Sequence, residues 1–242
     1  GTALGLVESP ACRTNPGHCA RVRYNAWRSE QIFAIWADVW GASRSRLKFV
    51  LSTQAVWADV TRDMLDGGTR GADMLGITAY MSPQGGVDSS YSPLTPSEVI
   101  DRFKAGAEGA RGYMGAQKAL AQENGLSVAV YEGGVGLVEA GAIESGEATG
   151  AVTELLMATG RSPEFKAAVS TWFAMIRQEL GDQTSFGYFV DTGFWSKYGQ
   201  WGMREYYDAA TATSPAAAAV HEHIDALAGA LSGCVKADSM GR

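Results

Sequence analysis

The residue whose surroundings are best suited to chemistry is a glutamate at the end of a run of alternating apolar residues. Glu132 follows the stretch LSVAVY and precedes Gly133 and Gly134. The alternation predicts a β-strand that ends at Glu132, and the glycines leave room for a backbone turn or a ligand. A carboxylate on a rigid strand beside free volume is suited to catalysis or binding. An ion pair with an arginine is the alternative interpretation.

Other predicted strands also end in polar or aromatic residues. Gln54 follows LKFVLST, Tyr80 lies at the end of DMLGITAYM, and Asp191 closes SFGYFVD. Because ligands of βα proteins bind where strand carboxyl ends open into loops, we expect these side chains near a common mouth. Asp191 could instead cap the following turn, and Gln54 could bridge neighbouring loops. Further aromatic residues in mouth-side loops could stack on sugars: Trp57, Tyr91, Trp195, Tyr198 and Trp201.

The elements that must position these residues alternate along the chain. Apolar spacing and stop signals predict helices over 24–40, 56–65, 95–124, a region ending at 180 and 214–233, with strands over 47–53, 73–81, 126–132 and 185–191. Strand and helix alternate four times without a hairpin signal, which predicts an α/β fold with a parallel sheet. Trp27, Trp36, Trp40 and Trp172 fall on the helices at spacing typical of core packing.

The number of βα units indicates half of a barrel. A (β/α)8 TIM barrel takes about 250 residues and eight such units, whereas four are visible in these 242 residues. We predict an N-terminal loop segment over 1–23, the C-terminal half of a (β/α)8 barrel over 24–233, and a frayed tail over 234–242. An open half-barrel exposes two strand edges, so we expect a complementary N-terminal half-barrel chain as partner, or self-association that mimics one.

Four residues carry a resemblance to a known group of enzymes. Glu132 in VYEGG, Tyr80 in GITAYM, and Trp195 and Trp201 in FVDTGFWSKYGQWG together resemble the second half of a clan A glycoside hydrolase, a retaining (β/α)8 group. The likeness covers about residues 24–208. It implies that Glu132 is the nucleophile, that Tyr80 orients it through a hydrogen bond, and that Trp195 forms the wall of a sugar subsite.

The resemblance also implies a second carboxyl group, which the chain does not supply in the expected place. The group carries its acid/base glutamate after an asparagine at the end of the fourth strand, and no Asn-Glu pair precedes residue 24. Glu8 is a poor substitute because Ser9 and Pro10 follow it. Since retaining hydrolysis needs two carboxyl groups, we expect a processed chain whose partner carries the acid/base.

These observations favour a glycosidase acting on a poly- or oligosaccharide, with this chain supplying the nucleophile half of the site. A non-catalytic carbohydrate-binding or scaffolding half-barrel is the alternative. A flavodoxin-like phosphate-binding sheet is disfavoured because no glycine-rich turn of the nucleotide-binding type follows a predicted strand.

Composition and cysteine spacing restrict partners and location. The net charge of −6 is spread without a basic cluster, and no apolar run approaches about 18 residues, so we expect neither nucleic-acid nor membrane binding. No metal or cofactor is required by these patterns. Cys12 and Cys19 are spaced for a disulfide, which predicts a secreted or periplasmic protein; a zinc site with His18 is one ligand short. Cys234 has no obvious mate.

Overall fold

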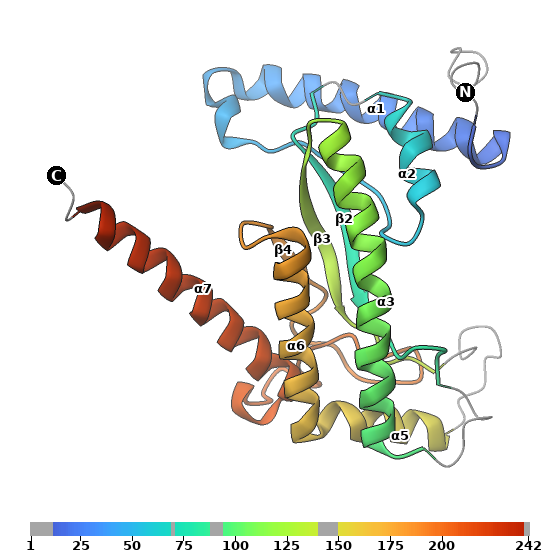
Figure 1. Ribbon diagram of the computed structural model, residues 1–242, viewed down its shortest axis with the longest axis vertical. Helices are drawn as coiled ribbons and strands as arrows, with labels where there is room; N and C mark the ends of the chain where they lie inside the picture. Colours follow the sequence, from blue (N-terminus) through green and yellow to red (C-terminus); the bar gives the residue numbers. More distant parts are fainter. Residues whose placement is uncertain (1–11, 69–70, 88–93, 140–149, 240–242) are drawn as a thin grey trace. The chain divides into compact units, whose positions relative to one another are not determined.

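The computed structural model describes residues 12–68, 71–87, 94–139 and 150–239 (Figure 1). Within this part of the chain the fold is α/β, with a four-stranded parallel sheet in the order β1-β2-β3-β4. The predicted alternation of parallel strands and helices is therefore confirmed. The strands are β1 (Val50–Ser52), β2 (Met74–Met81), β3 (Ser127–Val135) and β4 (Phe186–Tyr188). The helices are α1 (Pro16–Trp40), α2 (Ala58–Leu65), α3 (Pro96–Glu123), α5 (Gly150–Arg161), α6 (Pro163–Leu180) and α7 (Pro215–Ser239), with 3-10 turns η2 (Gly41–Arg46) and η4 (Thr211–Thr213).

Local capping signals determine where several helices begin and end. The N–H of Thr95 donates to the Glu98 carboxylate over 2.7 Å, and the N–H of Glu98 donates to the Thr95 hydroxyl over 3.4 Å, which forms the predicted capping box of α3. Gly41, with φ of 46°, ends α1 as predicted. These contacts replace the hydrogen bonds that the first and last turns of a helix lack.

Two predicted boundaries are wrong because these helices extend further. Asn15 caps α1 by accepting from the N–H of His18 over 2.9 Å, so residues 16–23 are helix and not part of a loop segment. The Asn15-Pro16 pair is itself a helix-start signal. At the other end, α7 continues to Ser239, past the expected stop at residue 233.

The aromatic face of α1 is not the packed surface that its spacing predicts. Trp36 is 51% exposed, and Ile32, Ile35 and Val39 are exposed beside it. The buried residues of α1, Cys19, Arg23 and Ala26, all lie in its first half. By contrast, Trp172 of α6 is fully buried, as predicted.

Strand β2 has one buried face and one partly open face. Leu75, Ile77, Ala79 and Met81 are at most 3% exposed, whereas Thr78 and Tyr80 on the alternate positions are half-buried. Leu51 of β1 pairs in register with Leu75 and is also buried. Successive side chains of a strand point to opposite faces, so Tyr80 belongs to the partly open face.

Strand β3 runs past Glu132 to Val135, so the predicted strand end at Glu132 is wrong. The Ser127 N–H bonds to the carbonyl of Asp73, and the Gly136 N–H bonds to the carbonyl of Met81. The interval from 127 to 136 is one residue longer than that from 73 to 81, which is the signature of a β-bulge in β3.

The glycine after Glu132 serves a close approach between strands. A Cβ on Gly133 would lie 2.4 Å from the carbonyl oxygen of Ala79 and 3.0 Å from the ring of Phe186. The glycine is therefore required by backbone packing, whereas the sequence interpretation took it as open space above a carboxylate.

The chain divides into two compact units, each built from three segments. Unit 1 comprises Gly1–Ala79, Ala110–Gly133 and Gln178–Gly187, and unit 2 comprises Tyr80–Gly109, Gly134–Arg177 and Tyr188–Arg242. The core of unit 1 includes Leu51, Met64, Leu75, Ile77, Leu120 and Val130. The core of unit 2 includes Phe103, Leu156, Phe165, Val169, Trp172 and Ala217.

Candidate functional site

Glu132 is the sixth of the nine residues of β3, and its side chain is half-buried. Burial raises the pKa of the neighbouring Tyr131, and the negative charge of Glu132 adds to this rise. The Tyr131 ring lies 3.2 Å from the place that a Cβ on Gly76 would take, so Tyr131 is on the partly open face of the sheet. Side chains of a regular strand alternate between the two faces of the sheet, and the β-bulge adds one residue to β3. The face on which Glu132 lies therefore depends on the position of the bulge.

Tyr80 and Trp201, both predicted site residues, are in contact. Their ring centroids are 5.5 Å apart at an interplanar angle of 80°, an edge-to-face pair. The Trp201 indole N–H donates to the carbonyl of Tyr198 over 2.9 Å. Trp201 is half-buried and Tyr198 is 55% exposed, so the pair and its neighbour present aromatic surface near the carboxyl end of β2.

Backbone hydrogen bonds hold Trp201 in place. The N–H of Val190 donates to the carbonyl of Trp201 over 3.1 Å, and the N–H of Met203 returns a bond to Val190 over 2.9 Å. The N–H of Gln200 donates to the carbonyl of Leu137, just after β3, over 3.0 Å. The loop after β4 is thereby closed on itself and tied to the end of β3.

Trp195 contributes to packing in this loop. The side chain is 6% exposed, and its indole N–H donates to the carbonyl of Gly202 over 3.0 Å. The guanidinium of Arg161 lies 5.8 Å from its ring, and a Cβ on Gly160 of α5 would lie 3.0 Å from it. A role for Trp195 as a sugar-subsite wall stays a prediction, and it would require this packing to open.

The predicted strand over 185–191 is too long, because β4 ends at Tyr188. Asp191 therefore lies in the loop after β4. Its carboxylate accepts hydrogen bonds from Arg204 and from the hydroxyl of Thr192, the latter over 3.1 Å. The Arg204 bond is the main cause of a lowered Asp191 pKa; burial opposes it, and the Thr192 bond adds to it. Asp191 is thus engaged in an ion pair at the start of the loop.

Gln54 lies in the loop after β1, with its side chain exposed. The fully buried amide of Gln117 donates to the carbonyls of Gln54 and Ala55 over 3.1 and 3.0 Å. Sequence reasoning missed Gln117 because it is a single polar residue in the middle of α3. An isolated glutamine on the buried face of a helix is the signal that could have found it.

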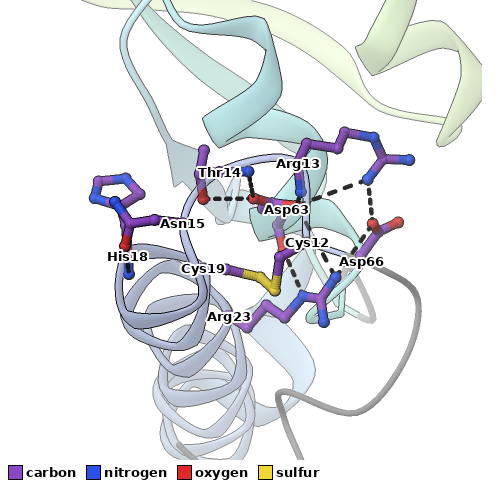
Figure 2. Close-up of a disulfide and its surroundings, with 9 residues drawn as sticks. All are labelled: Cys12, Arg13, Thr14, Asn15, His18, Cys19, Arg23, Asp63 and Asp66. Carbon is purple, nitrogen blue, oxygen red and sulfur yellow. Dashed lines mark hydrogen bonds and ion pairs between the residues drawn. A yellow bond between two sulfur atoms is a disulfide. The ribbon is translucent and has the colours of Figure 1, made fainter.

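The predicted disulfide joins Cys12 to Cys19, with Cα atoms 5.8 Å apart (Figure 2). Because both sulfurs are consumed by this bond, they are not thiolate ligands for zinc. The disulfide fixes the segment before α1, and His18 lies next to it in the first turn.

A buried carboxylate anchors the same segment (Figure 2). Asp63 of α2, whose side chain is 0% exposed, accepts from the N–H groups of Arg13 and Thr14 over 2.9 Å each and from the Thr14 hydroxyl over 2.6 Å. The guanidinium groups of Arg13 and of the buried Arg23 lie 3.8 and 4.0 Å from it. Gly67 permits this packing, since a Cβ there would lie 2.8 Å from the Cα of Arg23.

Glu8 and Tyr91 lie outside the described residues, as does the side chain of Cys234. Among the helices described, none has the length and apolar character needed to cross a membrane. Comparison of the chain with protein-family models, with curated proteins and with solved structures finds no match in any of the three.

Proposed function

We propose that the chain is the nucleophile half of a retaining glycoside hydrolase that acts on a poly- or oligosaccharide. The observation that supports this most directly is the contact between Tyr80 and Trp201, whose ring centroids are 5.5 Å apart. Aromatic rings beside the carboxyl end of a parallel strand suit the apolar face of a sugar. Glu132 of β3 is the proposed nucleophile.

In the proposed reaction, the Glu132 carboxylate attacks the anomeric carbon while a second carboxyl group protonates the departing glycosidic oxygen. A glycosyl-enzyme ester forms, and water then hydrolyses it with the second group acting as base. In this scheme, Tyr80 donates a hydrogen bond to the carboxylate and fixes its orientation.

The second carboxyl group is proposed to come from a partner chain that completes the (β/α)8 barrel. Within the described residues, β1 and β4 are the edges of a sheet of four strands, and closure of a barrel needs strands that pair with both. The exposed apolar side chains of Ile32, Ile35 and Trp36 on α1 are consistent with a chain that covers them. The disulfide supports a secreted or periplasmic location.

The test is the Glu132→Gln substitution in the protein purified together with any partner chain that associates with it. We expect hydrolysis of neutral oligosaccharides, followed by chromatography, to fall about 10³-fold or more, because Gln cannot form the ester. Glu222→Gln, at a glutamate that is 62% exposed and paired with Lys166, is the matched control and should leave the rate unchanged. Undiminished turnover by the Glu132 variant would exclude the proposed role.

A non-catalytic carbohydrate-binding role is the second candidate, and the exposed ring of Tyr198 beside Trp201 favours it. Such a ring can bind sugar without chemistry. Calorimetric binding of an oligosaccharide by the native protein, with no product after prolonged incubation, would favour this function over hydrolysis.

A further inference from the structure

Unit 1 contains a cavity that the proposed catalytic residues do not line. Its volume is about 610 Å³, within the range of roughly 300–1,000 Å³ of small-molecule sites. Its walls come from the segment that starts α1, from the β1–α2 loop with the first turn of α2, and from the middle of α3. The lining residues used below are Asn15, His18, Trp57, Asp59, Arg62 and Tyr113.

Two aromatic rings contribute to the apolar surface of the cavity. Trp57 is 55% exposed and Tyr113 is 49% exposed, although both are large rings that a fold usually buries. They come from elements far apart in the sequence, α3 and the loop after β1, and meet at one cavity. Exposed rings of this kind are suited to stacking on the flat apolar face of a ligand.

The polar groups of the cavity suit a neutral, hydroxyl-bearing ligand. Asp59 and Arg62 form an ion pair of 3.2 Å at the cavity wall, so their charges balance and favour neither an anion nor a cation. The side chains of Asn15 and Asp59 line the cavity and are exposed, so they can exchange hydrogen bonds with hydroxyl groups of a ligand.

The walls are held in place before any ligand binds. The Cys12–Cys19 disulfide and the bonds of Thr14 to Asp63 fix the α1 side. On the other side, the carbonyl of Trp57 accepts from the N–H of Thr61 over 3.1 Å. A preformed site loses less conformational entropy on binding, which favours affinity.

We propose that this cavity binds one ring of a neutral oligosaccharide, stacked on Trp57 and Tyr113, as a sugar site separate from Glu132. The choice of a sugar rests on the proposed function, whereas the existence of a site for a neutral ring rests on the cavity alone. The site lies beside the loop after β1.

The test is calorimetry on the Glu132→Gln protein, to prevent turnover, with cellohexaose, xylohexaose, mannohexaose and chitohexaose as probes. Trp57→Ala and Tyr113→Ala in that background should each weaken binding of the preferred hexasaccharide about tenfold. Tyr207→Ala is the matched control, because Tyr207 is 87% exposed but lies outside the cavity, and it should bind as the parent does. Trp57→Phe, which keeps a ring, should restore most of the affinity.

The outcomes separate this inference from the proposed function. Equal affinity of the Trp57→Ala, Tyr113→Ala and Tyr207→Ala variants, or no binding of any probe, overturns the sugar site. Hydrolysis by the Glu132→Gln protein would overturn the catalytic proposal. The sugar site would still be supported if Trp57→Ala weakens oligosaccharide binding in that protein. Tryptophan fluorescence gives a second readout. Stacking of a sugar on Trp57 should change the fluorescence of the Glu132→Gln protein, and this change should be absent when Trp57 is also replaced with Phe.

Discussion

Replacing Asp63 with alanine is expected to lower the free energy of unfolding by about 3–5 kcal/mol, the range for breaking a buried ion pair. The carboxylate is 0% exposed and accepts three hydrogen bonds from Arg13 and Thr14. It also lies near the guanidinium of the buried Arg23. Alanine leaves these donors without their acceptor and removes one carboxylate from beside a buried cation.

The magnitude can be compared with the hydrogen bonds that are lost. Hydrogen bonds to a charged group contribute about 1.5–3 kcal/mol each, net of desolvation, so three independent bonds would amount to roughly 5–9 kcal/mol. Because these three share one carboxylate, their contributions are not additive, and the expected loss is below that sum. A loss of about 3–5 kcal/mol corresponds, for a chain of this size, to a fall in Tm of roughly 10 °C.

Urea denaturation followed by circular dichroism and by tryptophan fluorescence measures this change. Asp59→Asn, in the same helix, is the control: Asp59 is 64% exposed and pairs with a partly exposed Arg62, so its loss should cost less than about 1 kcal/mol. A loss below 1 kcal/mol for Asp63→Ala would refute the inference that this carboxylate anchors the segment before α1.

The pH dependence gives an independent check. Burial alone would raise the Asp63 pKa, but the N–H bonds from Arg13 and Thr14 and the Thr14 hydroxyl outweigh it, so the folded pKa lies below the usual 3.8. A carboxyl group whose pKa is lower in the folded than in the unfolded protein stabilises the fold at pH values above its unfolded-state pKa. This stabilisation is lost as the pH falls through the folded-state pKa. The difference in the free energy of unfolding between the wild type and the Asp63→Asn variant should therefore become smaller below about pH 4. A difference that stays constant from pH 7 to 3 would contradict this.

Further substitutions test other parts of the structure. Replacing Cys12 and Cys19 with serine should cost about 2–3 kcal/mol in urea denaturation, since the closed loop is short; no change on reduction of the wild type would contradict this. Gly133→Ala should cost at least about 2 kcal/mol by forcing a Cβ to 2.4 Å from the neighbouring strand, whereas Gly112→Ala, in open space on α3, should raise Tm slightly; equal effects would argue against the close approach. Thr95→Ala should cost about 1 kcal/mol through loss of the capping box, measured by thermal melting.

Helix positions were predictable because their signals are local. Thr95 and Glu98 lie three residues apart and cap each other, and Gly41 ends α1 through its own backbone conformation. The start of α1 at Pro16 carried an equally local signal that the prediction overlooked. The exposure of Trp36 was not predictable, because spacing identifies an apolar face of a helix but not whether another element covers it.

The end of β3 could not be predicted because it depends on neighbouring backbone. Gly133 and Gly134 are weak strand formers, yet the strand continues to Val135 because Gly133 lets β2 approach closely. The three-residue β4 is shorter than its aromatic run predicted, and the residues after Tyr188 bond instead within the following loop.

Of the candidate site, the contact between Tyr80 and Trp201 agrees with the expected mouth, because strand ends and their loops lie at one edge of a parallel sheet. The burial of Trp195 could not be inferred, since it depends on Gly160 and Arg161 of α5. The cavity of His18, Trp57 and Tyr113 escaped the prediction because three distant segments form it.

The division of the chain into two units has a consequence for how the protein can be taken apart. The boundaries at 79/80, 109/110, 133/134, 177/178 and 187/188 fall inside β2, α3, β3, α6 and β4. No single cleavage or truncation can release either unit intact, because every boundary severs a helix or strand that both share. Expression of one unit alone would need three stretches of the gene spliced together, and a protease that nicks a surface loop should leave the fragments associated.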